Sequence, residues 1–182
     1  MTTEQLASKQ LTNESYMQRA VELAKRGQYT TSPNPNVGCV LVKNNQVIGE
    51  GWHIKAGQGH AEVNAIANAK ELGNDINGAT AYVTLEPCSH FGRTPPCAQG
   101  LIDAGIKHVV IGMVDPNPLV SGRGVTMLNN AGISTESGVL ESACRALNPG
   151  FIKRMSQGKP VLRCKMAASL DGKTAMQSGE SK

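Results

Sequence analysis

Apolar residues recur along the chain with two different periods, which predict helices and strands respectively. From Asn13 onward, Met17, Ala20, Val21 and Ala24 fall on one face of a helix. Short apolar runs bounded by Gly, Pro or Asn are instead typical of strands. Together the patterns predict helices at 13–26, 60–72, 97–104, 125–130 and 140–147, and strands at 37–42, 47–51, 80–85, 108–113 and 133–135.

The order of these elements indicates the fold class. A helix and a hairpin are followed by alternating helices and strands, which predicts an α/β sandwich with helices on both faces of a mixed sheet. Pro149 interrupts the last helix, and 151–155 are expected to resume it. Residues 1–12 are polar and are expected to form a flexible lead-in. After a change of composition near 156–158, residues 160–166 predict a further strand, which we interpret as the start of another domain.

The positive charge lies at the C-terminal end of the chain. The formal net charge is +4, yet residues 1–150 carry 11 basic and 12 acidic side chains, whereas 151–182 carry 7 and 2. A nucleic-acid enzyme usually has a basic face on its main body. A stacking platform for single strands also needs more aromatic residues than the one Trp, three Tyr and two Phe present. The composition therefore favours a small-molecule substrate and no nucleic-acid partner.

The ends of the chain and its cysteines bear on its location. The first residues lack the apolar segment of a secretory signal, and no apolar run approaches the ~20 residues of a membrane span. We therefore expect a soluble cytoplasmic protein with no membrane partner. Five cysteines in such a chain argue against a disulfide framework and leave metal binding, catalysis or burial. Cys39, Cys144 and Cys164 are interpreted as small buried residues.

Two segments carry the residue types of a zinc site. His60-Ala61-Glu62 opens a predicted helix, and Cys88 and Cys97 follow a predicted strand on either side of a loop. One neutral imidazole and two thiolates are three zinc ligands that leave the fourth tetrahedral position open. Zinc in such a site lowers the pKa of a bound water to ~7. Glu62, two residues from a ligand, is placed to take that proton and return it to a leaving group.

Simpler explanations exist for each part of this pattern. A single His-x-Glu is common by chance, and two cysteines separated by eight residues are more often unrelated core thiols. A structural zinc site would need a fourth protein ligand, for which His90 is the nearest candidate. The combination is more specific than its parts, because it matches the zinc deaminase signature, in which hydroxide attacks a ring carbon that bears an amino group.

Longer strings resemble one family within that class. TSPNPNVGCVLV, HAEV and TLEPCSHFGRTPPCAQGLIDAGIKHVVIGMVDPNP closely resemble the deaminase domain of the bifunctional deaminase/reductases of riboflavin biosynthesis, over about residues 13–155. The tail KPVLRCKMAASLDGKTAMQSGESK resembles the opening strand and substrate loop of their NADPH-dependent reductase domain. The resemblance implies a cytidine-deaminase-like three-layer α/β/α sandwich, with a zinc-dependent deaminase domain at 13–156. It also implies a linker and the truncated start of a reductase domain at 157–182.

The resemblance further implies a reaction and a site. The substrate would be a diaminohydroxy-phosphoribosylamino-pyrimidine that loses its ring amino group as ammonia. One zinc ion per chain would be held by His60, Cys88 and Cys97, Glu62 would shuttle protons, and NADPH would be needed only by the missing reductase domain. Self-association of the chain is also expected. The positions that match substrate-facing residues of the family are Asn34, His53, His90, Arg93, Asp115, Asn117 and Arg123.

Some of these positions have structural alternatives. Asn34 and Asp115 each precede a proline, where an Asx-type turn would explain them. Arg93 would otherwise be a solvated loop charge. A structural role is an alternative for both His53 and His108, and it is the interpretation for His108, which starts a predicted strand. Asn64 stands where the family commonly has His in HAEVHA, which affects hydrogen bonding around the site rather than zinc ligation.

Three other functions are compatible with parts of the sequence. A deaminase of another nucleobase, of a nucleoside or of tRNA adenosine would share the fold, but such enzymes usually show Cys-x-x-Cys rather than the longer spacing here. A reductase would need a nicotinamide-binding domain for which the chain has no room. A zinc-stabilised module without activity would leave Glu62 without a task.

Overall fold

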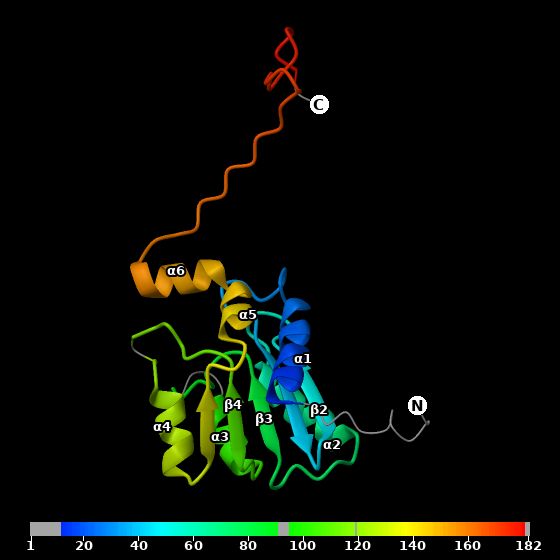
Figure 1. Cartoon of the computed structure of the whole chain (residues 1–182), viewed down its shortest axis with the longest axis vertical. Coiled ribbons are helices and arrows are strands. Elements are labelled where there is room, and N and C mark those ends of the chain that lie inside the picture. Colours follow the sequence, from blue (N-terminus) through cyan, green and yellow to red (C-terminus); the bar gives the residue numbers. More distant parts are fainter. Residues whose placement is uncertain (1–11, 91–94, 119, 181–182) are drawn as a thin grey trace, which may run out of the picture.

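The fold is built on a five-stranded mixed sheet (Figure 1). The computed structural model describes residues 12–90, 95–118 and 120–180. Across the sheet, β1 is antiparallel to both β2 and β3, whereas β3, β4 and β5 run parallel to one another. The strands, in spatial order, are β2 (Gln46–Trp52), β1 (Gly38–Lys43), β3 (Thr80–Val83), β4 (His108–Ile111) and β5 (Ser134–Ser137).

Helices cover both faces of this sheet and enclose two apolar cores. Side chains alternate between the faces of a strand, so in β1 Cys39 and Leu41 join one core while Val40 and Val42 join the other. The three-layer α/β/α sandwich on a mixed sheet is therefore confirmed. The first core lies under α2 (Ala61–Glu71), α3 (Cys97–Asp103) and α4 (Arg123–Asn130), and the second under α1 (Asn13–Lys25), α5 (Glu141–Ala146) and α6 (Pro149–Gln157).

Close backbone contact sets the position of α2 on β2. A Cβ on Gly51 would lie 2.3 Å from the amide nitrogen of Ala65 and 2.5 Å from the carbonyl oxygen of Ala61. Only glycine permits this approach without displacement of the helix. The first turn of α2, with His60 at its N-cap, is therefore held directly against the C-terminal part of β2.

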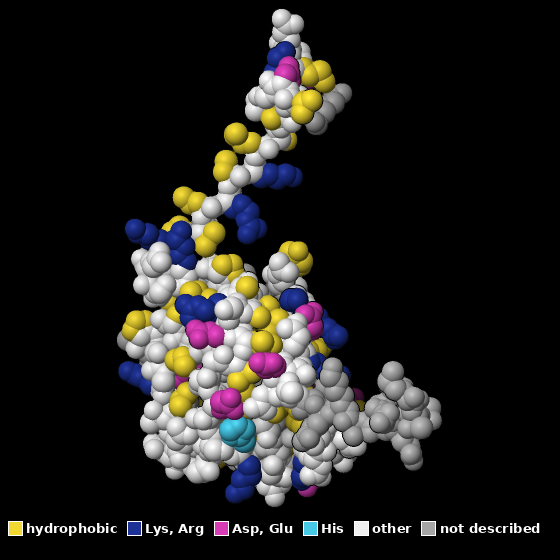
Figure 2. Space-filling model, in the orientation of Figure 1, with side chains coloured by type: hydrophobic (Ala, Val, Ile, Leu, Met, Phe, Trp, Pro, Cys, Tyr) yellow, Lys and Arg dark blue, Asp and Glu magenta, His cyan; other side chains and the backbone are white. Residues whose placement is uncertain are grey.

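The C-terminal residues differ from expectation. The interruption near Pro149 and the helix at 151–155 are confirmed, although α6 begins at Pro149 itself. A proline at the first helical position loses no intrahelical hydrogen bond. The strand expected at 160–166 is wrong: these residues pair with no strand among those described. The segment runs away from the body (Figure 1), where no sheet edge is within reach to satisfy a ladder. The basic side chains expected from the sequence are spaced along this extension (Figure 2).

Two further expectations concern the ends and membranes. The predicted lead-in, apart from Thr12, lies outside the described residues. Thr12 caps α1, since its side chain accepts a hydrogen bond from the backbone N–H of Ser15. Within the described ranges, no helix is both long enough and apolar enough to cross a bilayer.

Candidate active site

Three metal-binding side chains meet at the edge of the sheet where β2, β3 and β4 end. The Nδ1 atom of His60 lies 3.2 Å from Sγ of Cys97 and 3.8 Å from Sγ of Cys88. All three ligand atoms lie within 4.8 Å of one another, and His90 is not part of this cluster. The predicted ligand set is therefore brought together by the fold, and the alternative with His90 as a fourth structural ligand has no support.

The donor set and its spacing fit zinc. Bonds of ~2.3 Å to sulfur and ~2.0 Å to nitrogen in a tetrahedron place neighbouring ligand atoms about 3.5–3.8 Å apart, close to the distances found here. His60 occupies the N-cap of α2 and Cys97 the first position of α3. Both helix N-termini carry partial positive charge, which stabilises thiolates.

Electrostatic coupling within the cluster favours one thiolate even without a metal. A hydrogen bond from Cys97 lowers the pKa of Cys88, while the same bond, together with burial, raises the pKa of Cys97. The hydrogen bond with Cys88 also raises the pKa of His60. Since both sulfurs must be deprotonated to bind a metal, metal binding is expected to release protons from this cluster.

Glu62 lies beside the cluster without belonging to it. It is in the first turn of α2, and its side chain is only 3 % exposed. Burial raises the pKa of this carboxyl to about 7. A carboxyl that is readily both protonated and ionised near neutral pH suits general acid–base catalysis, as the sequence predicted for this position.

A cavity of about 250 Å³ opens directly onto these residues. A larger, more open depression of about 560 Å³ lies at the opposite end of the sheet, but no His, Cys, Asp or Glu lines it. The smaller cavity is therefore the candidate active site. Among the residues that line it are the predicted site residues Asn34, His53, His60, Glu62, Cys88, His90, Asp115 and Asn117.

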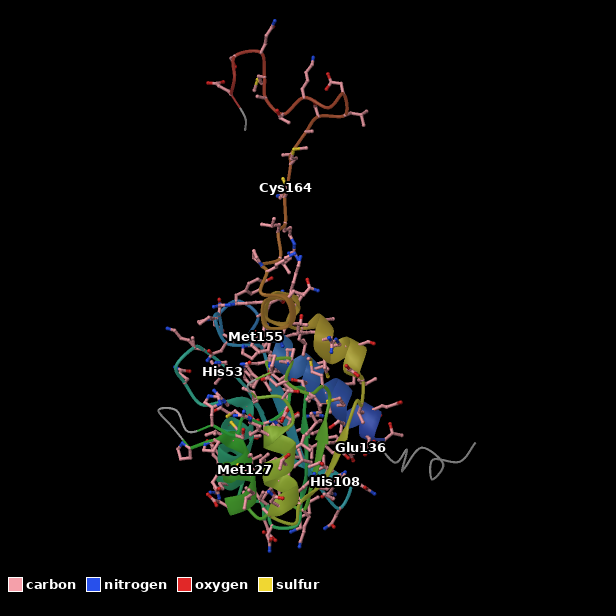
Figure 3. All side chains as sticks on the ribbon, turned by 90° about the vertical axis from the view of Figure 1, so that its left-hand side faces the viewer. His53, His108, Met127, Glu136, Met155 and Cys164 are labelled. Atoms are coloured by element: carbon pink, nitrogen blue, oxygen red, sulfur yellow. The ribbon has the colours of Figure 1, made fainter. Side chains whose placement is uncertain are left out.

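Hydrogen bonds fix the orientation of His53 and Asn34 in the cavity wall. His53 is buried, and its Nδ1 lies 3.1 Å from the carbonyl oxygen of Gly59, to which it must donate. Its Nε2, 3.2 Å from Nδ2 of Asn34, therefore accepts from the Asn34 amide. Burial lowers the pKa of His53, in keeping with this neutral tautomer. Figure 3 shows His53 far from His108 in the body.

Asn64 supports the same region from α2. Its Nδ2 donates to the carbonyl oxygen of Trp52 at 2.7 Å and to that of Gly59 at 3.1 Å. These bonds join α2 to the end of β2 and to the residue that precedes His60. Asn64, which stands where the family commonly has His, therefore still makes hydrogen bonds around the site.

The loop after β4 contributes Asp115 and Asn117. The Asp115 carboxylate accepts a hydrogen bond from the Asn117 backbone N–H at 2.8 Å, so the predicted Asx-type turn is present. Both residues also line the cavity. Burial raises the pKa of Asp115. Arg123, the first residue of α4, is exposed and does not line the cavity, and Arg93 lies outside the described residues.

Sequence reasoning did not identify the other residues that line the cavity, which are Pro35, Val37, Leu85, Glu86, Val120 and Phe151. Glu86 lies two positions before Cys88, and an acidic residue so close to a predicted metal ligand could have been chosen as a candidate site residue. Val120 and Phe151 are apolar residues that reach the cavity only because of the tertiary fold, and no local sequence pattern distinguishes them from core residues.

The remaining histidine and cysteines do not line the cavity. His108 bonds to the hydroxyl of Ser134 at 2.7 Å, near Glu136 (Figure 3), which confirms its structural role. Cys39 and Cys144 are buried, as expected. Cys164 is exposed on the extension, so the expectation that it is buried is wrong.

Comparisons with known proteins agree with this site. Residues 10–113 match the family described as cytidine and deoxycytidylate deaminase zinc-binding region. The chain is 59% identical over 167 residues to the riboflavin biosynthesis protein RibD of Haemophilus influenzae, covering 92% of the chain and 44% of that protein. It is 55% identical over 145 residues to a diaminohydroxyphosphoribosylamino-pyrimidine deaminase of Buchnera aphidicola, covering 80% of the chain and 97% of that protein.

A solved structure extends the comparison to the fold. RibD of Acinetobacter baumannii superposes with a TM-score of 0.87 at 60% identity, over 93% of this chain and 47% of that one. The chain thus spans about half the length of these RibD relatives.

Proposed function

Since this chain belongs to the cytidine and deoxycytidylate deaminase zinc-binding family, we propose that it hydrolyses the ring amino group of a diaminohydroxy-phosphoribosylamino-pyrimidine and releases ammonia. One observation carries the proposal: a single cavity joins the metal cluster, through His60 and Cys88, to the buried Glu62 and to polar side chains from four loops. The Buchnera relative, which carries the name of this activity, matches over almost its whole length and supports the same assignment.

Zinc bound by His60, Cys88 and Cys97 would supply the Lewis acidity that makes hydroxide available near neutral pH. The chain's own contribution is proton transfer by Glu62. Its carboxylate takes a proton from the water that attacks the amine-bearing ring carbon and gives one to the ring nitrogen. It then carries the second proton to the departing amine, so that ammonia leaves as a neutral molecule.

Asn34 and His53 orient the pyrimidine in this proposal. The Nδ2 of Asn34 donates to His53. The Oδ1 of Asn34 is therefore the atom that contacts the substrate, where it can accept a hydrogen bond from a ring N–H or an amino group. The carbonyl of Gly59 keeps His53 in the tautomer that this arrangement requires. The pyrimidine edge would thus be read by an acceptor whose direction is set before the substrate binds.

The other end of the cavity suits the ribosyl phosphate. Asp115 and Asn117 supply acceptors and donors for ribose hydroxyls, while His90 supplies a ring N–H for the phosphate. Arg93 and Arg123 stay predictions for phosphate binding, because a dianion favours guanidinium donors.

The proposal includes four further features. One zinc ion binds per chain, the chain self-associates, and it works in the cytoplasm. The NADPH-dependent reduction implied by the tail's resemblance belongs to a reductase domain outside 13–156.

Ammonia release from the phosphorylated diaminopyrimidine riboside tests the proposed function. Wild type and Glu62→Gln are assayed side by side with equal zinc content, and deoxycytidine monophosphate serves as a second substrate. Release by wild type alone, from the diaminopyrimidine alone, is expected. Preference for deoxycytidine monophosphate would instead assign a different amine substrate to the same site.

A further inference from the structure

The carboxylate of Glu86 is buried in the wall of the cavity and accepts four backbone hydrogen bonds. Its side chain is 4 % exposed overall. Oε2 accepts from the N–H of Asp115 and of Gly122, both at 3.0 Å. Oε1 accepts from the N–H of Gly124 at 2.9 Å and of Val125 at 3.3 Å. Glu86 is not a member of the metal cluster.

The four donors belong to the two ends of the 115–125 segment, of which residues 115–118 and 120–125 are described. Asp115 follows β4 and lines the cavity, whereas Gly124 and Val125 lie in the first turn of α4. The N-cap of α4, Gly122, has a φ of +76° and offers no side chain to bond these N–H groups. Glu86 therefore caps α4 from a distant part of the chain and ties that cap to Asp115.

Gly124 makes this arrangement possible. A Cβ there would lie 2.0 Å from the carbonyl oxygen of Pro87 and 3.2 Å from Oε1 of Glu86. The absence of a side chain lets the first turn of α4 reach the 86–88 turn directly. The Ser-Gly-Arg-Gly sequence at 121–124 thus supplies two glycines with separate tasks, in addition to the arginine singled out from the sequence.

Only Pro87 separates Glu86 from Cys88. The turn that carries a metal ligand is therefore the same turn that holds the 115–125 segment. The Glu86 carboxylate thus links the turn that carries Cys88 to Asp115, and Asp115 in turn bonds the Asn117 N–H. The backbone N–H of Glu86 adds a second link to the end of β4, since it donates to the carbonyl oxygen of Met113 at 2.9 Å. The Glu86 side chain therefore joins the turn next to the metal cluster to both ends of the 115–125 segment.

We propose that Glu86 is a positioning residue that holds the 115–125 segment in the shape that binds the ribosyl-phosphate half of the substrate. This inference rests on the proposed function for the identity of the substrate. The hydrogen bonds that carry it are independent of the reaction. Glu86 itself moves no proton in this assignment, because both of its oxygens are occupied by backbone donors.

Glu86→Gln is the variant that tests this role. Glutamine keeps the shape but replaces one oxygen by an NH₂ group, which cannot accept from the two backbone N–H groups that it faces. Glu71→Gln, at an exposed position in α2, is the matched control. Hydrogen exchange of backbone amides, bound zinc, KM and kcat are measured for wild type and both variants.

The expected result has two parts. In Glu86→Gln, amides of the 115–125 segment exchange about tenfold faster or more, while those of β3 and α2 are unchanged. KM for the phosphorylated riboside rises about tenfold, with kcat within about threefold of wild type and zinc retained. Glu71→Gln changes none of these quantities.

Other results would overturn the inference. Faster exchange with an unchanged KM means that Glu86 only caps a helix, and loss of zinc or of kcat alone means that it acts on the metal cluster. If Glu86→Gln does not fold, Gly124→Ala, which pushes α4 away and keeps the carboxylate, must give the same rise in KM. An inactive wild type would refute the proposed function, while hydrogen exchange would still decide whether Glu86 holds the segment.

Discussion

Asn148 holds the backbone of Asn36 at both of its polar groups. The Oδ1 of Asn148 accepts the Asn36 N–H at 2.7 Å, and its Nδ2 donates to the Asn36 carbonyl oxygen at 2.8 Å. Asn36 lies two residues after Asn34, and Asn148 directly precedes α6, which carries Phe151 into the cavity wall. The α5–α6 connection therefore ties the loop that carries Asn34 to the helix that carries Phe151, and both of these residues line the cavity.

Replacement of Asn148 by Ala should destabilise the folded chain. The side chain is 7 % exposed, so its loss leaves the Asn36 N–H and carbonyl without these partners in a mostly buried place. We expect the free energy of unfolding to fall by about 2–3 kcal/mol, measured by urea denaturation of the zinc-loaded protein. Asn130→Ala, at the exposed end of α4, is the control and should change it by less than about 0.5 kcal/mol. Equal effects of the two variants would contradict the role of this pair.

Replacement of Glu62 by Gln should abolish most activity and leave the metal in place. The amide has the same shape, but it cannot shuttle protons, and Glu62 is not in the cluster of ligands. The rate of ammonia release should fall about 100- to 10,000-fold, while zinc measured by atomic absorption stays at one equivalent. Glu71→Gln, on the same helix, should keep full activity. A Glu62→Gln enzyme with more than about a tenth of the wild-type rate would rule out the proposed proton transfer.

Replacement of Cys97 by Ser should remove the metal and the activity together. A serine hydroxyl is a poor zinc ligand, and the remaining His60 and Cys88 are too few for a stable site. The variant should retain well under one equivalent of zinc after dialysis against a weak chelator, and its activity should fall in proportion to the zinc. Cys164→Ser, on the exposed extension, is the matched control and should keep both. Activity without zinc would refute the metal-dependent scheme.

Replacement of Asp115 by Asn should stabilise the fold at neutral pH while weakening substrate binding. Burial raises the pKa of Asp115 above 3.8, and the charges of Glu86 and Cys88 add to this effect. The folded chain therefore binds the proton more tightly than the unfolded chain, and the stabilisation is complete below the unfolded pKa and lost as pH rises through the folded one. At pH 7 the ionised group thus costs stability that asparagine avoids.

The measurement is the thermal unfolding midpoint of wild type and Asp115→Asn at pH 7 and at pH 4. The midpoint of the variant should be higher at pH 7, and the difference should shrink at pH 4, while KM at pH 7 rises. Asp103→Asn, at an exposed position in α3, should give the same small difference at both pH values. A difference that grows as pH falls would have the wrong sign for this explanation.

Local patterns in the sequence were sufficient to predict most helices and strands and the three residues of the metal cluster. The period of apolar residues depends only on backbone geometry, so helices such as α2 and strands such as β1 could be predicted from it. His60, Cys88 and Cys97 could be found because zinc ligands are few in type and their position beside helix starts is visible in the chain. The strand predicted at 160–166 is wrong for a related reason: a local pattern shows that a segment could form a strand, but not whether a neighbouring strand is there to pair with it.

The sequence by itself determined the α/β class and predicted the ligand set and Glu62 as the proton carrier, because each prediction follows from residue type and short-range spacing. The fold brings His60, Cys88 and Cys97 together as that prediction requires. Only the tertiary structure showed that Glu86 bonds four backbone N–H groups, that Asn148 holds Asn36 and that Phe151 lines the cavity. These relationships join residues roughly 30–110 positions apart in the chain. Each depends on how helices close over the sheet, and pairings over such separations leave no periodic signal in the local sequence.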